Sequence, residues 1–132
     1  MELSDWSINA DENGFAVPDG FPDDMSFRGV NNSMREIMAV MSRHFADNNG
    51  TLVSFGDIDN FYTLDTNGDY SAPLAPGTSF AFKAHAASSS NICRLALDVG
   101  GSQIDYGLIL RNASAISAGE YYTVFFLSLI HI

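Results

Sequence analysis

The sequence predicts an α+β fold that is mainly β: an extended N-terminal arm, one short helix, and a small antiparallel β-sandwich or barrel-like domain. Three observations predict this organisation. Residues 1–28 are rich in turn-forming residues, residues 29–50 have the apolar spacing of a helix, and residues 51–126 contain short β-branched and aromatic segments separated by turns. A chain of 132 residues is long enough for one domain with its own core.

The N-terminal arm, residues 1–28, contains the turn-rich stretches NADENG and VPDGFPDD. Its aromatic residues are scattered and cannot form a core by themselves. We therefore expect the arm to lie extended, with these aromatics docked onto the rest of the chain or onto a neighbouring subunit. They are Trp6, Phe15, Phe21 and Phe27.

The helix is predicted over 29–50, GVNNSMREIMAVMSRHFADNNG. Asn31 or Asn32 is expected to cap its start, because a side-chain oxygen there can accept a free first-turn N–H. Glu36 near the start and Arg43 near the end complement the helix dipole. Gly50 is available for a left-handed exit at the end of the helix.

One face of this helix is apolar. Met34, Met38, Met41 and Phe45 follow 4-3-4 spacing, and Ile37 lies beside them. The spacing fits either packing within the chain or the seam of a coiled coil. A helix of about two heptads is not stable alone, so it needs contacts with the rest of the chain or with another copy. We expect Met38 and Met41 to be buried and these five residues to form the packing or oligomer seam. Methionines usually fill packing gaps, so a cofactor site is not expected.

From Thr51 onward, six short segments predict strands: TLVSF, NFYTL, SFAFKA, NICRLALDV, SQIDYGLIL and EYYTVFF. Turn signals separate them, and alternation such as that of Phe80 and Phe82 is typical of a half-buried strand. The predicted strands do not alternate with helices, as strands of a parallel sheet usually do, so an antiparallel arrangement is expected. Asn67-Gly68 predicts a hairpin turn after NFYTL.

The charge and the cysteine content exclude several classes of function. A formal net charge of -10 opposes non-specific binding to nucleic acid or to an anionic membrane surface. No apolar run reaches membrane-spanning length, and the acidic N-terminus does not resemble a signal peptide. Cys93 is the only cysteine and lies among apolar residues, which predicts a buried structural thiol.

No catalytic or metal-binding constellation is found. In DTNGDY, Asp65, Asn67 and Asp69 occupy the first, third and fifth positions of a calcium loop, but Tyr70 and Pro76 replace its glycine and glutamate. The three histidines lack metal-ligand spacing. Asp57 and Asp59 form a carboxylate pair of the kind glycosidases use, but such pairs are expected by chance in an acidic chain. No cofactor, no metal and no enzymatic activity are predicted.

The ordered motifs carry a resemblance to a known family. After the N-A-D-x-N turn come V-N-N-S-M-R-E-I-M from Val30 to Met38, then Gly50-Thr51, Y-T-L at Tyr62 to Leu64, and F-K-A at Phe82 to Ala84. This order resembles the N-terminal region of bacteriophage tail fibre and tail-spike-like proteins. The family pattern has aspartate where this chain has Asn32, and P-S-S where it has FPDDMSFRG.

The resemblance implies a structural virion protein, usually trimeric, that attaches to other tail proteins and is made in the bacterial host cytoplasm. An alternative function is a carbohydrate- or receptor-binding module of a phage or cell-surface adhesin, whose Tyr70, Tyr121 and Tyr122 could stack on sugars such as host surface glycans. A third is a fragment of a glycan-depolymerising enzyme. The end of the chain, LSLIHI, resembles the translated read-through of a sequencing adapter, which implies that residues 127–132 are not native; the alternative is an edge strand.

Overall fold

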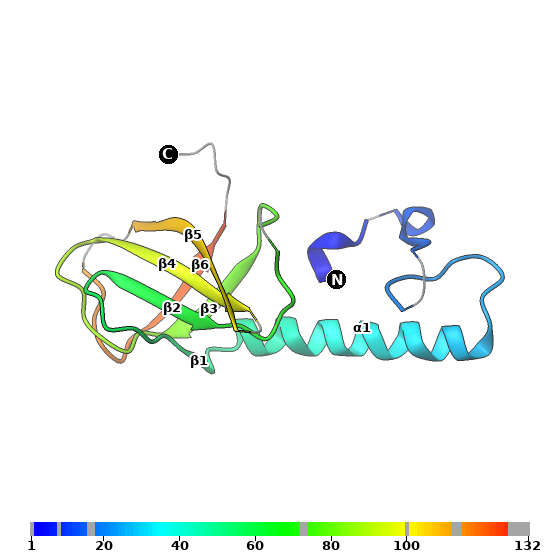
Figure 1. Ribbon diagram of the computed structural model, residues 1–132, viewed down its shortest axis with the longest axis horizontal. Helices are drawn as coiled ribbons and strands as arrows, with labels where there is room; N and C mark the ends of the chain where they lie inside the picture. The colour runs from blue at the N-terminus through cyan, green and yellow to red at the C-terminus, as the bar shows by residue number, and fades with distance from the viewer. Residues whose placement is uncertain are drawn as a thin grey trace.

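In the computed structural model one long helix projects from the end of a small β-sandwich, and the N-terminal arm lies along one side of the helix (Figure 1). The structure describes residues 2–7, 9–15, 18–71, 74–99, 101–111 and 115–126. Within them are one α-helix, two short 3-10 helices and six strands, which confirms the predicted α+β, mainly β class. Residues 127–132, for which a non-native tail was predicted, lie outside the described residues.

The arm is not simply extended as predicted. It forms two 3-10 helices, η1 (Leu3–Asp5) and η2 (Ala10–Asn13), and then turns back toward the helix. The Asn13 side chain accepts a hydrogen bond from the Ser7 backbone N–H and donates one to the Ser7 carbonyl. Trp6 is half-buried and donates its indole N–H to the Asp19 carbonyl at 3.1 Å. The arm is therefore held partly by its own hydrogen bonds.

Helix α1 runs over Phe27–Asn48 and starts two residues earlier than predicted. Its N-cap is Ser26, whose hydroxyl oxygen accepts a hydrogen bond from the Gly29 N–H at 3.1 Å. The prediction that Asn31 or Asn32 caps the helix is wrong, because both lie within it and are exposed. The predicted exit is confirmed, since Gly50 has φ +85.

The six predicted strands are all present: β1 (Leu52–Val53), β2 (Phe61–Asp65), β3 (Ser79–Lys83), β4 (Ile92–Val99), β5 (Ser102–Arg111) and β6 (Tyr121–Phe125). They form two three-stranded sheets with the orders β1-β3-β6 and β2-β4-β5. The expected antiparallel arrangement is only half right, because β1 pairs with β3 and β2 with β4 in parallel. The described strands form no closed barrel.

The predicted hairpin at Asn67-Gly68 is also wrong. Strand β2 continues into a loop and the next strand, β3, belongs to the other sheet, so the two strands do not pair. The antiparallel hairpin of the second sheet instead joins β4 to β5, and Gly101 in its turn has φ +85. The loop after β2 has a different partner, which is helix α1.

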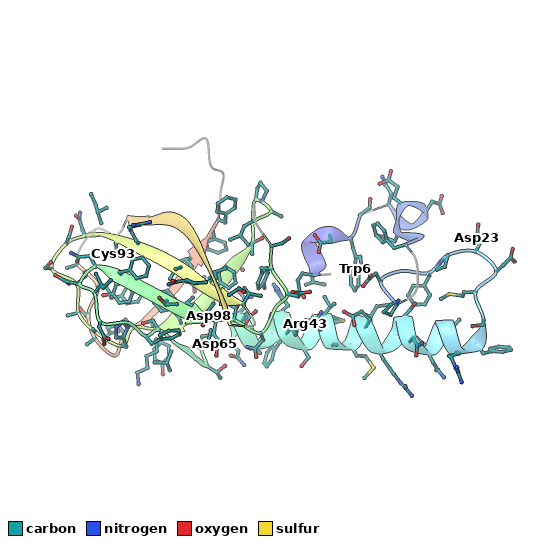
Figure 2. All side chains as sticks on the ribbon, viewed as in Figure 1. Trp6, Asp23, Arg43, Asp65, Cys93 and Asp98 are labelled. Carbon is teal, nitrogen blue, oxygen red and sulfur yellow. The ribbon has the colours of Figure 1, made fainter. Side chains whose placement is uncertain are left out.

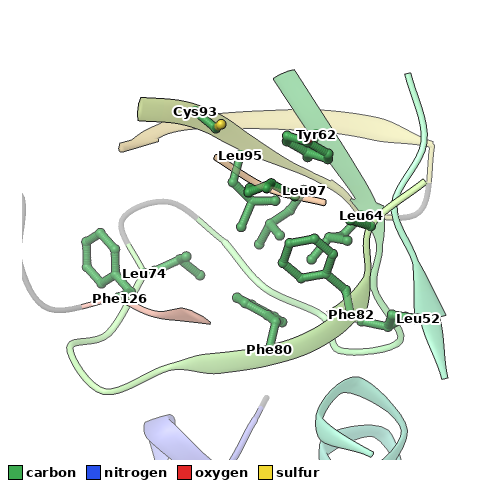
Figure 3. Packing of buried hydrophobic residues seen from close by; sticks show 12 residues of the cluster. Leu52, Tyr62, Leu64, Leu74, Phe80, Phe82, Cys93, Leu95, Leu97 and Phe126 are labelled. Atoms are coloured by element: carbon green, nitrogen blue, oxygen red, sulfur yellow. The ribbon is translucent and has the colours of Figure 1, made fainter. Parts of the chain in front are cut away.

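The hydrophobic core lies between the two sheets (Figure 3). Phe80 and Phe82 of β3 face Tyr62 and Leu64 of β2, and the alternating burial of β3 confirms its predicted half-buried character. Cys93, Leu95 and Leu97 line the β4 side, and Cys93 is 1% exposed, as predicted for a structural thiol.

The carboxylate of Asp47 joins the helix to the sandwich. Its side chain is 0% exposed. Oδ1 accepts hydrogen bonds from the backbone N–H and the side-chain amide of Asn67, at 2.7 and 2.9 Å. Oδ2 accepts from the Gly68 N–H at 2.9 Å and from the Tyr70 hydroxyl at 3.3 Å. Four donors thus compensate the desolvation of this buried charge.

Gly68 permits this contact because it has no side chain. A Cβ at Gly68 would clash with the Tyr70 side chain, since it would lie 2.5 Å from Cζ and 2.9 Å from the hydroxyl oxygen. Tyr70 in turn packs edge-on against Phe80, with ring centroids 5.2 Å apart. The loop is therefore fixed between a helix carboxylate and a core aromatic ring.

We predict that Asp47→Ala lowers the free energy of unfolding by about 3 kcal/mol, because it leaves the buried N–H of Gly68 and the part-buried N–H of Asn67 without their acceptor. Asp47→Asn keeps the shape but points amide hydrogens at two donors, and should cost about 1–3 kcal/mol. Urea denaturation measures both. Asp65→Ala, which removes an exposed aspartate near the same loop, is the control and should change stability by less than about 0.5 kcal/mol. Equal effects at the two positions would contradict the role of Asp47.

Tyr70 gives a second prediction. Burial of its hydroxyl and the neighbouring Asp47 carboxylate raise the pKa of Tyr70 above its usual range near 10. At pH values below about 10, Tyr70 is protonated in both the folded and the unfolded states, so its hydroxyl contributes fully to the stability of the folded state. As the pH rises further the unfolded chain loses this proton first, and stability falls. The denaturation midpoint of Tyr70→Phe should therefore fall less between pH 9 and pH 11 than the midpoint of the parent chain. Tyr121→Phe, which changes an exposed tyrosine, is the control and should behave like the parent.

Candidate functional site

One face of α1 is covered by the chain's own arm. The buried residues of the helix recur at helical spacing: Gly29, Ser33, Val40 and Asp47. The Ser33 hydroxyl is buried and donates to the Gly20 carbonyl at 2.6 Å. The small side chain of Ser33 allows Gly20 of the arm to approach the helix closely enough for this hydrogen bond. This face is therefore already occupied.

Glu2 fastens the start of the arm to the helix and to the loop after β2. Its carboxylate is 5% exposed and accepts hydrogen bonds from Arg43 at 3.0 Å and from the Asp69 N–H at 3.1 Å. Arg43 also pairs with Glu36 at 3.0 Å and lies on the arm-facing side of α1 (Figure 2). Partial burial opposes the charge of Arg43, but the two carboxylates outweigh it and raise its pKa, so the guanidinium stays charged.

The face of α1 away from the arm carries five exposed apolar side chains, here named the methionine stripe. Their exposed fractions are 94% for Phe27, 53% for Met34, 70% for Met38, 59% for Met41 and 68% for Phe45. Ile37, predicted to belong to the same seam, is half-buried at the edge of the stripe. The prediction that Met38 and Met41 are buried is wrong for the single chain. The alternative, a seam between copies, stays a prediction.

Sequence reasoning missed Phe27 as a member of the stripe, because the helix was expected to start at 29. The signal was present in Ser26, a preferred N-cap residue directly before Phe27. With Phe27 included, the stripe extends along nearly the whole helix. Exposed apolar side chains in such a contiguous row are typical of an interaction surface.

A serine–histidine pair was also missed, since its members are 31 residues apart. The Ser54 hydroxyl lies 2.7 Å from His85 Nδ1 and accepts a hydrogen bond from the His85 N–H at 3.0 Å. His85 Nε2 lies 2.9 Å from the Gly56 carbonyl, which can only accept, so Nε2 is the donor in this contact. Ser54 is 2% exposed. A nucleophile must reach its substrate, so this pair fixes the loop between β1 and β2 and does not form a catalytic site.

The predicted carboxylate pair lies beside a hollow of about 240 Å³ that is bounded by residues 56–62 and 85–87. Asp57 and Asp59 are both exposed, and Asp59 accepts a hydrogen bond from the Ser89 hydroxyl at 2.5 Å. The hollow holds no arrangement that supports the glycosidase interpretation.

The residues of DTNGDY do not converge on an ion. Asn67 uses its side-chain amide and its N–H on Asp47, and the Asp69 N–H binds Glu2. Within the described part of the chain, no group of three histidine, cysteine, aspartate or glutamate side chains could hold a metal ion. The segment connects the helix, the arm and the sandwich.

Of the three tyrosines considered for glycan stacking, only Tyr121 presents its ring to solvent. Tyr70 packs between Gly68 and Phe80, and Tyr122 packs on Phe82 while its hydroxyl accepts from the Ser117 N–H. Tyr121 is 64% exposed, with the Lys83 ammonium 5.8 Å from the ring centroid. Phe125 is also exposed, at 62%, on the same strand.

Comparisons with known proteins give no relative. No family model matches the chain, and neither curated proteins nor solved structures contain a significant match. Among the described helices, none combines the length and apolar character that crossing a membrane requires. The methionine stripe is therefore the candidate functional site on its own geometry.

We predict that Met41→Asp leaves the fold intact and weakens self-association, because Met41 is exposed in the single chain but central in the stripe. A charge buried without a partner in a seam costs several kcal/mol. Circular dichroism and light scattering separate the two effects. Asn32→Asp adds the same charge at an exposed helix position off the stripe, and should leave the mass unchanged. Loss of folded structure in dilute Met41→Asp would contradict the placement of Met41.

Proposed function

We propose that this chain is a structural module of a phage tail fibre or tail-associated protein, and that the methionine stripe of α1 brings copies together. The observation that carries the proposal is the exposure of the stripe on a helix whose opposite face is already covered by the arm. The trimeric state, the attachment to other tail proteins and the location in the virion follow from the motif resemblance. The proposed role is not enzymatic.

The shape of the chain supports this proposal. Helix α1 projects from the sandwich with the arm on one side and no other segment on the opposite side in Figure 1. A monomer would leave five large apolar side chains in water at this surface. Their burial would contribute on the order of 5–10 kcal/mol per chain. That is comparable to the cost of association, which is about 4–15 kcal/mol.

The charge distribution supports self-association through the helix rather than through the sandwich. The chain has a net charge of -10, which makes like-charged surfaces repel. Helix α1 instead contains three of the six basic residues and two acidic ones, Glu36 and Asp47. Three basic residues against two acidic ones give α1 a formal charge of +1, so like-charge repulsion opposes contact between two copies of the helix less than contact between acidic parts of the chain.

A second candidate function is a carbohydrate- or receptor-binding module, and the exposed Tyr121 and Phe125 favour it. An exposed aromatic ring can stack on a sugar face, and Lys83 beside it could meet an acidic glycan. Titration of bacterial surface polysaccharide, with Tyr121→Ala as the matched control, would distinguish this function. It is compatible with an oligomeric chain.

We predict that light scattering of the chain at micromolar concentration gives three times its monomer mass of 14.3 kDa. The physical reason is the gain from burying the stripe. A monomer at high protein concentration would contradict the proposal.

For the phage assignment, the neighbouring reading frames should encode other virion tail proteins, and a neighbourhood without any phage gene would contradict it.

A further inference from the structure

The methionine stripe has a regular heptad register once Phe27 is included. Phe27, Met34 and Met41 are seven residues apart and occupy the d positions. Met38 and Phe45 occupy a positions. The remaining a position within this register is Asn31, which is exposed and lies between Phe27 and Met34. The next d position after Phe45 is Asn48, and its side chain accepts a hydrogen bond from Ser79 of β3 at 2.7 Å, so the seam ends where the sandwich begins.

Resting on the proposed self-association, we propose that Asn31 selects one arrangement of the copies: parallel helices in register. In a parallel, in-register bundle the same positions meet, so Asn31 faces Asn31 of each partner copy. The amides can then donate and accept among themselves. In an antiparallel bundle, a positions meet d positions, and Asn31 faces Met41. A parallel bundle shifted by one heptad places Asn31 against Met38. Both alternatives bury an amide against a thioether that cannot satisfy it.

The charges that flank the stripe favour the same arrangement. Arg28 and Arg35 occupy e positions, and Val30 and Ile37 occupy g positions. Antiparallel helices pair e with e, so Arg35 would face Arg35 of the other copy. Parallel helices pair e with g, so Arg35 lies over Val30, where its aliphatic stem can pack. Like charges placed opposite one another disfavour the antiparallel alternative.

The occupant of the stripe is therefore a second copy of this chain, and not an unrelated helix. Each feature is complementary to itself in the parallel arrangement: the apolar a and d layers, the single amide at Asn31, and Arg35 at e, whose aliphatic stem packs on Val30 at g. A partner helix of different sequence would need an amide at the same layer and would gain nothing from Arg28 and Arg35 unless it carried acids there.

Disulfide cross-linking tests the arrangement. Met34→Cys places a thiol at a d position, where a parallel, in-register bundle brings two copies of it together and any other arrangement does not. Mild oxidation should give a covalent dimer on a non-reducing gel. The parent chain is the control and should give none, because its Cys93 is 1% exposed.

Asn31→Met in the Met34→Cys chain should keep the oligomer, leave its melting temperature equal or higher, and lower the cross-linking yield by about threefold or more. Mixing this variant with an Asn31→Met, Met38→Cys chain should then yield the antiparallel 34–38 cross-link. Asn32→Met, next to Asn31 but off the stripe, is the matched control and should leave the yield unchanged.

The outcomes separate the two proposals. An oligomeric parent chain whose Met34→Cys variant does not cross-link would overturn the parallel arrangement alone. An unchanged yield in Asn31→Met would overturn the role of Asn31. A monomeric parent chain in light scattering would overturn both this inference and the proposed self-association.

Discussion

The buried carboxylate of Asp47 is the interaction on which the arrangement of the chain depends. It lies in the last turn of α1 and holds the loop after β2 through two backbone N–H groups, an amide and the Tyr70 hydroxyl. Glu2 binds the same loop through Asp69 and binds the helix through Arg43. Helix, arm and sandwich thus meet at one polar cluster. Because this cluster fixes which side of α1 faces the chain, it also fixes which side remains exposed.

The two faces of α1 differ in their residues and in their exposure to solvent. The inner face buries Gly29, Ser33 and Asp47, with Val40 as its one fully buried apolar side chain among the described helix residues, and Ser33 and Asp47 are hydrogen-bonded there. The outer face has the large apolar side chains. In most amphipathic helices the apolar face packs on the core. Here the specific polar contacts hold the chain together internally, and the apolar stripe remains exposed in the single chain.

Local features of this fold could be predicted from the sequence, whereas contacts between residues distant in the chain could not. The six strands were located correctly, because β-branched runs between turn residues are local signals. Their pairing was not, since parallel contacts of β1 with β3 and of β2 with β4 join residues distant in the chain. The stripe was recognised from its 4-3-4 spacing, but periodicity cannot tell a core from a seam. Asp47 and Glu2 gave no signal at all, because a buried carboxylate is visible only once its donors are in place.

The measurement that tests the account most directly is oxidation of the methionines by peroxide, followed by peptide mass spectrometry at increasing protein concentration. Met25 lies outside the helix and provides the internal reference. Self-association through the stripe predicts that Met34, Met38 and Met41 become protected relative to Met25 as the concentration rises, and lose that protection on dilution. Oxidation rates of these three methionines, relative to that of Met25, that stay the same at every protein concentration would contradict the account.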